Sequence, residues 1–154
     1  MRVTLMALAS LSSGLAAGAL LVGAVVILPL LLSQPVERYP AVNTFVLRRM
    51  DKMMPVCVGL AVLSGAVLAF AIQDPAGRAM YAVGALLLAG VVAVSIGRIG
   101  PINDAIGRMD TEAPRPDWRE LRARWRNWHI VRVSCGQAGA LLYTAALAAV
   151  LVTA

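Results

Sequence analysis

Hydrophobic residues are concentrated in four long runs of the chain, and most polar residues lie between these runs. The apolar runs cover about residues 5–32, 55–72, 79–99 and 130–152. An α-helix needs roughly 20 apolar residues to cross the hydrocarbon core of a bilayer, and each run comes close to or exceeds that length. The pattern therefore predicts an all-α integral membrane protein, a four-helix bundle in which residues 1–154 form a single membrane domain.

The first apolar run has an alternative interpretation as a secretory signal peptide. The apolar core of a signal peptide usually has about 7–15 residues, followed by small residues at a cleavage site. In this chain the run continues past the small residues AAGA at 16–19 as far as Pro29. We therefore expect this segment to be retained as the first membrane span.

The polar connections between the runs differ in length. The second connection, QDPAGR at 73–78, is short enough to make the second and third spans an antiparallel hairpin. The first connection, residues 33–54, and the third, residues 98–117, are longer and are interrupted by prolines. The remainder of each has room for a short helix, so we expect interfacial helical segments in the first and third connections.

The composition places this chain in a bilayer rather than in water. Hydrophobic residues make up 60% of it, charged residues only 14%, and the mean hydropathy is +0.77. One soluble core of this size could not bury so much apolar surface. The formal net charge of +6 would suggest a nucleic-acid partner in a soluble protein. Because the arginines adjoin apolar runs, we expect the lipid bilayer with its anionic headgroups as the partner, and no nucleic acid.

The basic residues are distributed unevenly between the two sides of the predicted bundle. Twelve of the fourteen belong to the first and third connections or to the adjoining ends of the spans, whereas Arg2 and Arg78 lie on the other side. Loops on the cytoplasmic side of a membrane carry an excess of Lys and Arg. We therefore expect a multi-pass protein of the cell (inner) membrane, with both termini on the non-cytoplasmic side.

The stretch from 118 to 143 holds all three tryptophans and the only histidine, and it leads directly into the last apolar run. At roughly 100° per residue, Trp125, His129, Arg132 and Tyr143 fall on one narrow stripe of a single long helix. Most arginines of this stretch point to other sides of that helix. We therefore expect the stripe to line a ligand cavity at the membrane boundary.

Several side chains of this stripe can serve either chemistry or structure. His129 has an ordinary titration range near neutral pH, so it could be a general base, an axial ligand or only an interfacial hydrogen-bond partner. Trp125 and Trp128 could stack on a planar ligand or anchor the helix at the interface. The spacing WxxWHxxR places two aromatic rings, an imidazole and a guanidinium within two helical turns, which suits a flat ligand with polar edges.

Three further polar residues lie near the same membrane face. Arg132 lies one turn inside the last span, where an unpaired guanidinium is costly, so it either extends to lipid phosphates or pairs with an anionic ligand, a phenolate or Asp104. Asn103 either orients a ligand or caps the turn after Pro101, and the Asn43 amide could hydrogen-bond to a polar ligand. The spacing alone leaves these alternatives open.

The chain offers few ligands for a metal ion. It has one histidine and two cysteines, and the four apolar runs contain no carboxylate. A histidine-rich or carboxylate-rich metal site therefore cannot be assembled. We expect no metal and no cofactor. The alternatives are Cu(I) bound by Met53, Met54 and Cys57, and haem bound by His129.

Four segments of the chain resemble a family of small four-helix membrane proteins that includes the anthrone oxygenases of aromatic polyketide pathways. They are GLAAG at 14–18, Pro29, GPIN at 100–103 and WRNWHIVR at 125–132. The resemblance covers most of the chain, and its specific part is PIN followed by WxxWHxxR. Ser95 departs from the family pattern, in which threonine is expected, but it keeps a hydroxyl group.

The resemblance implies an oxygenase that inserts oxygen at the activated methylene carbon of a tricyclic phenolic anthrone and gives an anthraquinone. Such a small apolar aromatic ligand can enter from lipid, and a base beside a cationic group could promote its oxidation without a cofactor. We hypothesise that His129 removes or relays the proton, and that Arg132 with Asn103 stabilises the enolate oxygen. The expected substrate-binding residues are Trp125, Trp128, Asn43, Ser95 and Tyr143.

Two other functions compete with an oxygenase. The first is a non-enzymatic binding or accessory protein that uses the same interfacial pocket for a lipid, a quinone or haem. The second is a transporter or channel, which is disfavoured because the spans hold few ionisable groups and too few polar groups to line a path. The small residues of the first two spans suit a homo-oligomer as well as packing within one chain.

Overall fold

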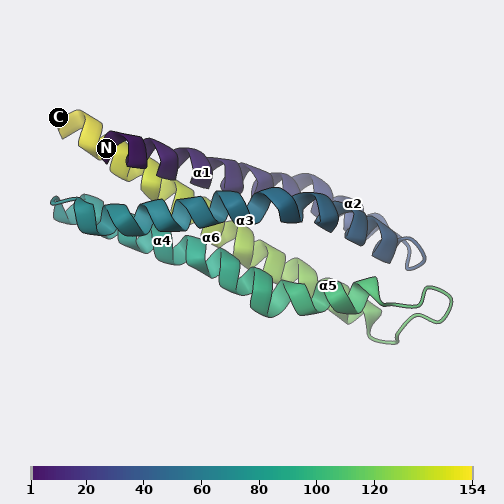
Figure 1. Ribbon diagram of the computed structural model, residues 1–154. Coiled ribbons are helices and arrows are strands. Elements are labelled where there is room, and N and C mark those ends of the chain that lie inside the picture. The colour runs from purple at the N-terminus through teal and green to yellow at the C-terminus, as the bar shows by residue number, and fades with distance from the viewer. Residues whose placement is uncertain (1, 154) are drawn as a thin grey trace.

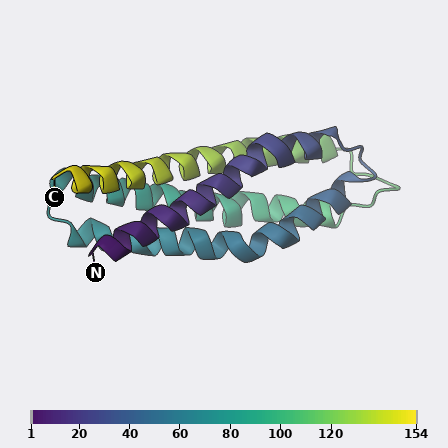
Figure 2. The same cartoon turned by 90° about the horizontal axis from the view of Figure 1, so that it is seen from above.

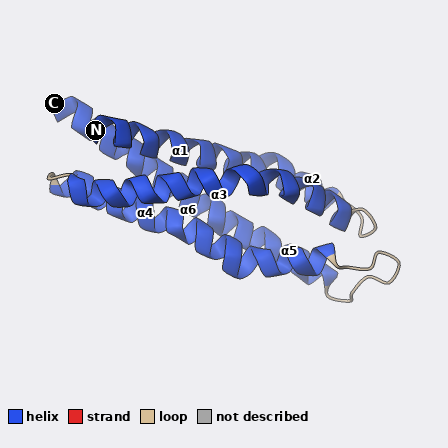
Figure 3. Cartoon of the chain, viewed as in Figure 1, coloured by secondary structure: helices blue, strands red, loops and turns tan. Residues whose placement is uncertain are grey.

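The computed structural model describes residues 2–153, and every secondary-structure element of that range is helical (Figure 3). The predicted all-α fold is therefore confirmed. The elements line up as four rods. The first rod comprises α1 (Arg2–Val22), the π-helical turn η1 (Gly23–Ile27) and α2 (Leu28–Ser33), the second is α3 (Tyr39–Ala71), the third comprises α4 (Pro75–Val94), the π-helical turn η2 (Ser95–Ile99) and α5 (Gly100–Gly107), and the fourth is α6 (Trp118–Thr153).

Each rod contains a segment that is long and apolar enough to cross a membrane, as the hydrophobic pattern predicts. These segments are Arg2–Ser33, Lys52–Ala71, Pro75–Gly107 and Trp118–Val150. With 36 residues, α6 is about 54 Å long at a rise of about 1.5 Å per residue. A hydrocarbon core is only about 30 Å thick, so the rods extend well beyond it.

The four rods pack around one another in a ring. The helix α1 packs against α3 and α6, and α4 packs against the same two helices from the other side. Both termini and the α3–α4 turn lie at one end of the bundle, which we call the terminal end (Figures 1 and 2). Residues 34–38 and 108–117 lie at the opposite end, which we call the connection end. Twelve basic residues of the sequence belong to the half that includes the connection end.

Three predicted boundaries differ from the observed ones. In the third connection, the expected short helix is present as α5, but it continues the third rod directly through η2, so this rod ends at Gly107 rather than near 99. The first connection does not hold a separate interfacial helix, because α3 continues from Tyr39 through Pro55 to Ala71. A proline inside a helix removes one backbone hydrogen bond and bends the axis, but tertiary packing of both halves can keep the helix continuous. At the other end, α4 begins at Pro75 rather than near 79, since the Asp74 carboxylate accepts a hydrogen bond from the Gly77 amide at 2.7 Å.

Two π-helical turns widen the first and third rods, and a proline follows each at the same distance. Pro29 stands two residues after η1, and Pro101 stands two residues after η2. In each turn the backbone reaches back five residues, with the Leu28 amide donating to the Gly23 carbonyl and the Gly100 amide to the Ser95 carbonyl. A proline ring would collide with a carbonyl of the preceding turn in a regular helix, and the wider turn relieves that collision.

Candidate functional site

The predicted stripe of α6 faces the inside of the bundle. Trp125 is 4% exposed, His129 is 3% exposed and Tyr143 is fully buried, while most arginines of the preceding turns are exposed. Arg122 differs from those arginines, because its Nη1 donates to the carbonyls of Leu32 and Gln34 at 3.2 and 3.1 Å. Arg122 thereby ties the first connection to α6, and the stripe faces inward as its spacing predicts.

A hydrogen-bonded network joins Arg132 to two other candidate residues. Its Nη2 lies 3.0 Å from His129 Nδ1, and its Nη1 donates to Ser95 Oγ at 3.3 Å. The Ser95 hydroxyl in turn donates to the Val91 carbonyl at 2.6 Å. A guanidinium can only donate hydrogen bonds, so His129 Nδ1 must accept and the proton of the neutral ring is carried by Nε2. The network therefore fixes the tautomer of the imidazole.

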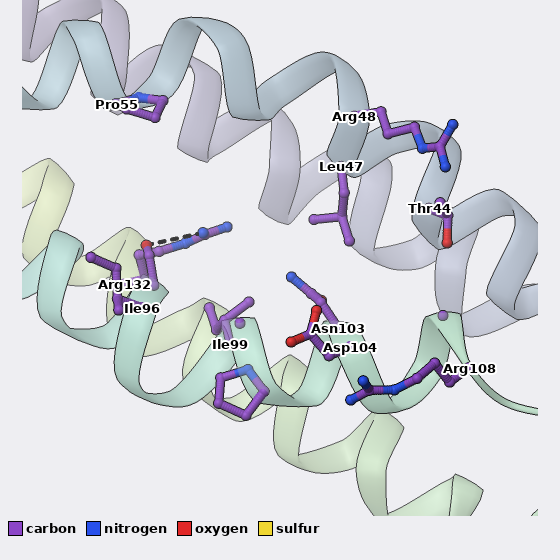
Figure 4. Close-up of a pocket in the computed structure, with 14 residues that line it drawn as sticks. Thr44, Leu47, Arg48, Pro55, Ile96, Ile99, Asn103, Asp104, Arg108 and Arg132 are labelled. Carbon is purple, nitrogen blue, oxygen red and sulfur yellow. Dashed lines mark hydrogen bonds between the residues drawn. The ribbon is translucent and has the colours of Figure 1, made fainter.

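The other side of the imidazole is held by an aromatic stack. The Trp125 indole lies parallel to the His129 ring, with 5.0 Å between centroids and an angle of 7° between planes. Trp125 Nε1 donates to Asn103 Oδ1 at 2.9 Å. Because an indole N–H can only donate, this bond fixes the Asn103 oxygen towards Trp125 and leaves its NH2 group as a donor for the groove (Figure 4). Asn103, Trp125, His129, Arg132 and Ser95 thus form one connected set.

The first rod contributes a glycine to this set through its π-helical turn. A Cβ atom added at Gly23 would lie 3.0 Å from both Cε1 and Nε2 of His129. That separation is shorter than ordinary van der Waals contact. The first residue of η1 therefore leaves just enough space for the imidazole edge, and a larger residue there would push the ring away from α1.

Three adjoining cavities meet at Arg132, which lines all of them. An open groove of about 780 Å³ lies between the first half of α3 and the segment η2–α5 (Figure 4). An apolar chamber of about 160 Å³ lies between α3 and residues 91–96 of the third rod. An inner cavity of about 60 Å³ lies between α1, η1, α3 and α6 and includes one edge of His129. The groove falls within the roughly 300–1,000 Å³ usual for small-molecule sites.

The groove is electrostatically positive. Three arginines line it, Arg48, Arg108 and Arg132, and among the described side chains that line it only Asp104 carries a negative charge. Arg48 and Arg108 are exposed at its mouth, and Arg132 is partly buried at its inner end. A ligand with an anionic or phenolic edge therefore meets three positive charges and one negative charge in the groove.

Three of the expected binding residues do not line these cavities. Trp128 is half-buried on another side of α6, with the Arg98 guanidinium 5.1 Å from its ring centroid. Tyr143 lies in the core towards the terminal end, where its hydroxyl donates to the Ala61 carbonyl at 3.0 Å. Asn43 is 1% exposed on α3. The structure thus separates these three residues from the set around Arg132.

Asn43 belongs to a buried polar group near the connection end. Its side chain lies beside the Tyr39 phenol, which is 1% exposed, and the Arg122 guanidinium lies 5.6 Å from the Tyr39 ring centroid. Burial raises the pKa of Tyr39 above its ordinary value of 10.0, and the neighbouring Asn43 side chain and the Arg122 charge lower it only in part. Tyr39 therefore stays a neutral phenol in this position.

Several lining residues lie outside the set that the sequence suggests. The largest group is apolar and comes from α3 and η2, and the sequence singles out only Met54 among them, as a candidate Cu(I) ligand. Pro55 was the available signal, because it stands between two predicted helical segments and a proline within a continuous helix bends the axis. These lining residues are Leu47, Met50, Met54, Pro55, Val58, Ile96 and Ile99.

Comparison with known proteins gives one match. The sequence model of a family described as anthrone oxygenase matches residues 44–142, which is more than half of the chain. The matched part begins in α3 and ends in α6, and it includes Ser95, Asn103, Trp125, His129 and Arg132. No curated protein and no solved structure matches the chain.

Proposed function

The chain belongs to the anthrone oxygenase family, and we propose that it oxidises a flat phenolic ligand of the anthrone type with O2 in the cavities around Arg132. One observation carries the proposal. The Arg132 guanidinium and the Asn103 amide, both hydrogen-bond donors, line a groove that is large enough for a small molecule and adjoins an apolar chamber. A charged and a neutral hydrogen-bond donor beside an apolar space suit an aromatic molecule whose oxygen becomes negatively charged during the reaction.

The proposed reaction converts a methylene group into a carbonyl group. Removal of one C–H proton gives an enolate, and its electrons reduce O2 to form a hydroperoxide at the same carbon. Loss of water from this hydroperoxide breaks the O–O bond and the second C–H bond and leaves the carbonyl. One oxygen atom of O2 is thereby kept in the product and the other leaves as water, so no further reductant is required.

Arg132 and Asn103 have the roles of oxyanion donors in this proposal. Both groups are held before a ligand arrives, Arg132 by Ser95 and His129, and Asn103 by Trp125. Asn103 is fixed in advance and needs little rearrangement as charge develops, whereas Arg132 keeps its bond to Ser95 but must release His129 to reach the oxygen. Trp125 holds both neighbours in place, because it stacks on the His129 ring and donates a hydrogen bond to Asn103.

His129 has the role of the base, with one condition that the geometry imposes. Its Nδ1 accepts a hydrogen bond from Arg132, so it can take a proton only when the guanidinium turns away. A developing enolate oxygen in the groove would draw the guanidinium towards itself. We therefore expect proton removal and charge stabilisation to be coupled through this one hydrogen bond.

The proposal also includes the membrane orientation. Twelve basic residues lie in the half that includes the connection end, against Arg2 and Arg78 towards the terminal end. The positive-inside rule supports a cytoplasmic connection end in the cell (inner) membrane, with both termini on the opposite side. The groove would then open towards the cytoplasm at the membrane boundary.

The variant His129→Asn tests this function and the role of the base together. An asparagine oxygen can accept the Arg132 hydrogen bond but cannot remove a proton at neutral pH. Purified protein in lipid nanodiscs would be given 1,8-dihydroxyanthrone, and O2 uptake and quinone absorbance would be followed. We expect wild-type protein to exceed empty nanodiscs, and His129→Asn to lose roughly 100-fold or more in kcat. Leu141→Ala, at a lipid-exposed position of the same helix, should match wild type.

The possible failures have different meanings. Wild-type rates no higher than those of empty nanodiscs would remove the oxygenase and leave a non-enzymatic binding protein. A His129→Asn variant with wild-type kcat would remove the base and make His129 a positioning residue for Arg132.

A further inference from the structure

The apolar chamber beside Arg132 differs from the groove in its lining. Six of its eight lining residues are apolar, and the two polar ones, Ser95 and Arg132, also line the groove. At about 160 Å³ the chamber is too small to hold a tricyclic ligand by itself, since ligand sites usually measure roughly 300–1,000 Å³. The complete lining is Met54, Pro55, Val58, Val91, Val92, Ser95, Ile96 and Arg132.

The outer side of this chamber is apolar and exposed. Three of its lining residues are exposed, namely Pro55, Ile96 with 73% and Val92 with 38% of its surface. The sequence has no charged residue between 53 and 71 on α3 or between 79 and 97 on the third rod. The exposed surface there is therefore apolar along both helices, as hydrocarbon contact requires.

Two local backbone features border the chamber. Pro55 lies inside α3 on one side, and η2 widens the third rod on the other side. A proline and a π-helical turn both alter the direction of a helix axis. Their effect comes from the backbone itself and does not depend on side-chain rotamers. The opening between α3 and η2 is thus built into the backbone.

The chamber adjoins the groove. They share four lining residues, Pro55, Ser95, Ile96 and Arg132. A molecule that passes inward between Val92 and Pro55 meets the Ser95 hydroxyl and the Arg132 guanidinium without first crossing water.

We infer that the chamber is a lateral opening through which a planar, apolar phenolic molecule dissolved in the bilayer reaches Arg132. Its ring system follows the apolar wall, and its oxygen-bearing edge ends at the donors of the groove. This inference rests on the proposed function for the kind of ligand, but it concerns passage and binding rather than oxidation. The competing occupant of the chamber is a lipid acyl chain. In that case the phenolic molecule reaches Arg132 by another route, and substitutions in the chamber do not change its binding rates.

The inference is tested by narrowing the opening and measuring both binding rates. The probe is 1,8-dihydroxyanthraquinone, added to protein in lipid nanodiscs and followed by stopped-flow quenching of tryptophan fluorescence at several probe-to-lipid ratios. Val92→Phe narrows the opening, and Val83→Phe is the matched control, because Val83 is 47% exposed on the same helix and lines none of the three cavities.

We expect Val92→Phe to slow association and dissociation alike, by about tenfold, because a narrower passage raises the barrier in both directions and leaves the affinity almost unchanged. Val83→Phe should behave as wild type. The widening variant Ile96→Ala should raise both rates, and it keeps the test decisive if the larger side chain prevents folding, which circular dichroism would show.

Each outcome decides the inference separately from the oxygenase proposal. Slower exchange in Val92→Phe supports the opening even if the wild-type protein never oxidises an anthrone. Equal rates in Val92→Phe, Val83→Phe and wild type would overturn it, as would Ile96→Ala rates equal to wild type. A wild-type protein that does not bind the probe at all would overturn both this inference and the proposed ligand class.

Discussion

One face of α6 is packed in two opposite ways along its length. Towards the terminal end, the Tyr143 ring fills the space that Gly65 of α3 and Gly84 of α4 leave free, and a Cβ atom at either glycine would overlap that ring. Towards the connection end, the same face carries Arg132 where three cavities meet. The stripe is therefore part of a closed core in one half and of an open site in the other.

The difference comes from the helices that face α6. Glycines let the neighbouring helices approach until an aromatic ring fills the contact. Pro55 and the turns η1 and η2 act in the opposite direction, since each widens or bends a helix. All three interruptions lie in the half that includes the connection end. The bundle thus uses small residues to close one half and backbone irregularity to open the other.

The largest effect on activity is expected when the charge of Arg132, which lines all three cavities, is removed. Arg132→Leu should lower kcat/KM for 1,8-dihydroxyanthrone by roughly 100-fold to 1,000-fold, the usual loss when an oxyanion donor is removed. Arg132→Lys should recover only part of this activity, because an ammonium cannot bond Ser95 and His129 at once in a planar fork. Equal activity of the leucine variant and wild type would show that the open half is not the reactive site.

An intermediate effect is expected in the closed half. Gly65→Ala should destabilise the protein by about 1–3 kcal/mol, since the added methyl group must displace the rigid Tyr143 ring from a filled contact. Gly59→Ala on the same helix is the control, because nothing lies within 4 Å of a Cβ atom there. Denaturant unfolding in detergent, followed by circular dichroism, would compare the two. Equal midpoints would mean that the terminal half is not closely packed.

The smallest effect is expected at the contact between η1 and the imidazole. Gly23→Ala should shift the His129 ring by a few tenths of an ångström, with about a tenfold loss of kcat because proton transfer depends strongly on geometry. Its effect on unfolding should be slight, since the ring borders a cavity and can move. Gly18→Ala on α1, with no atom within 4 Å of the added Cβ, should change neither quantity. An unchanged kcat in Gly23→Ala would show that the ring position is not critical.

The site was only partly predictable from the sequence. Trp125, His129 and Arg132 were predictable together, because they stand on one helix and their angular spacing is fixed by helix geometry. Ser95 and Asn103 could be selected from the family resemblance, but their hydrogen-bond partners, Arg132 and Trp125, could not be predicted. Trp128 shows the limit of proximity in sequence, since it is adjacent to His129 and yet contacts Arg98 on another side of the helix.

The four helical rods, their apolar lengths and the inward face of α6 follow from the amino-acid pattern, because these depend on local periodicity and on the apolar length that a bilayer requires. Which part of that face is filled and which is open follows instead from the packing of the helices. That outcome depends on what stands opposite each residue, a glycine against Tyr143 or a bent and widened backbone against Arg132. The separation between two helices is set by both partners at once, and neither segment encodes it alone.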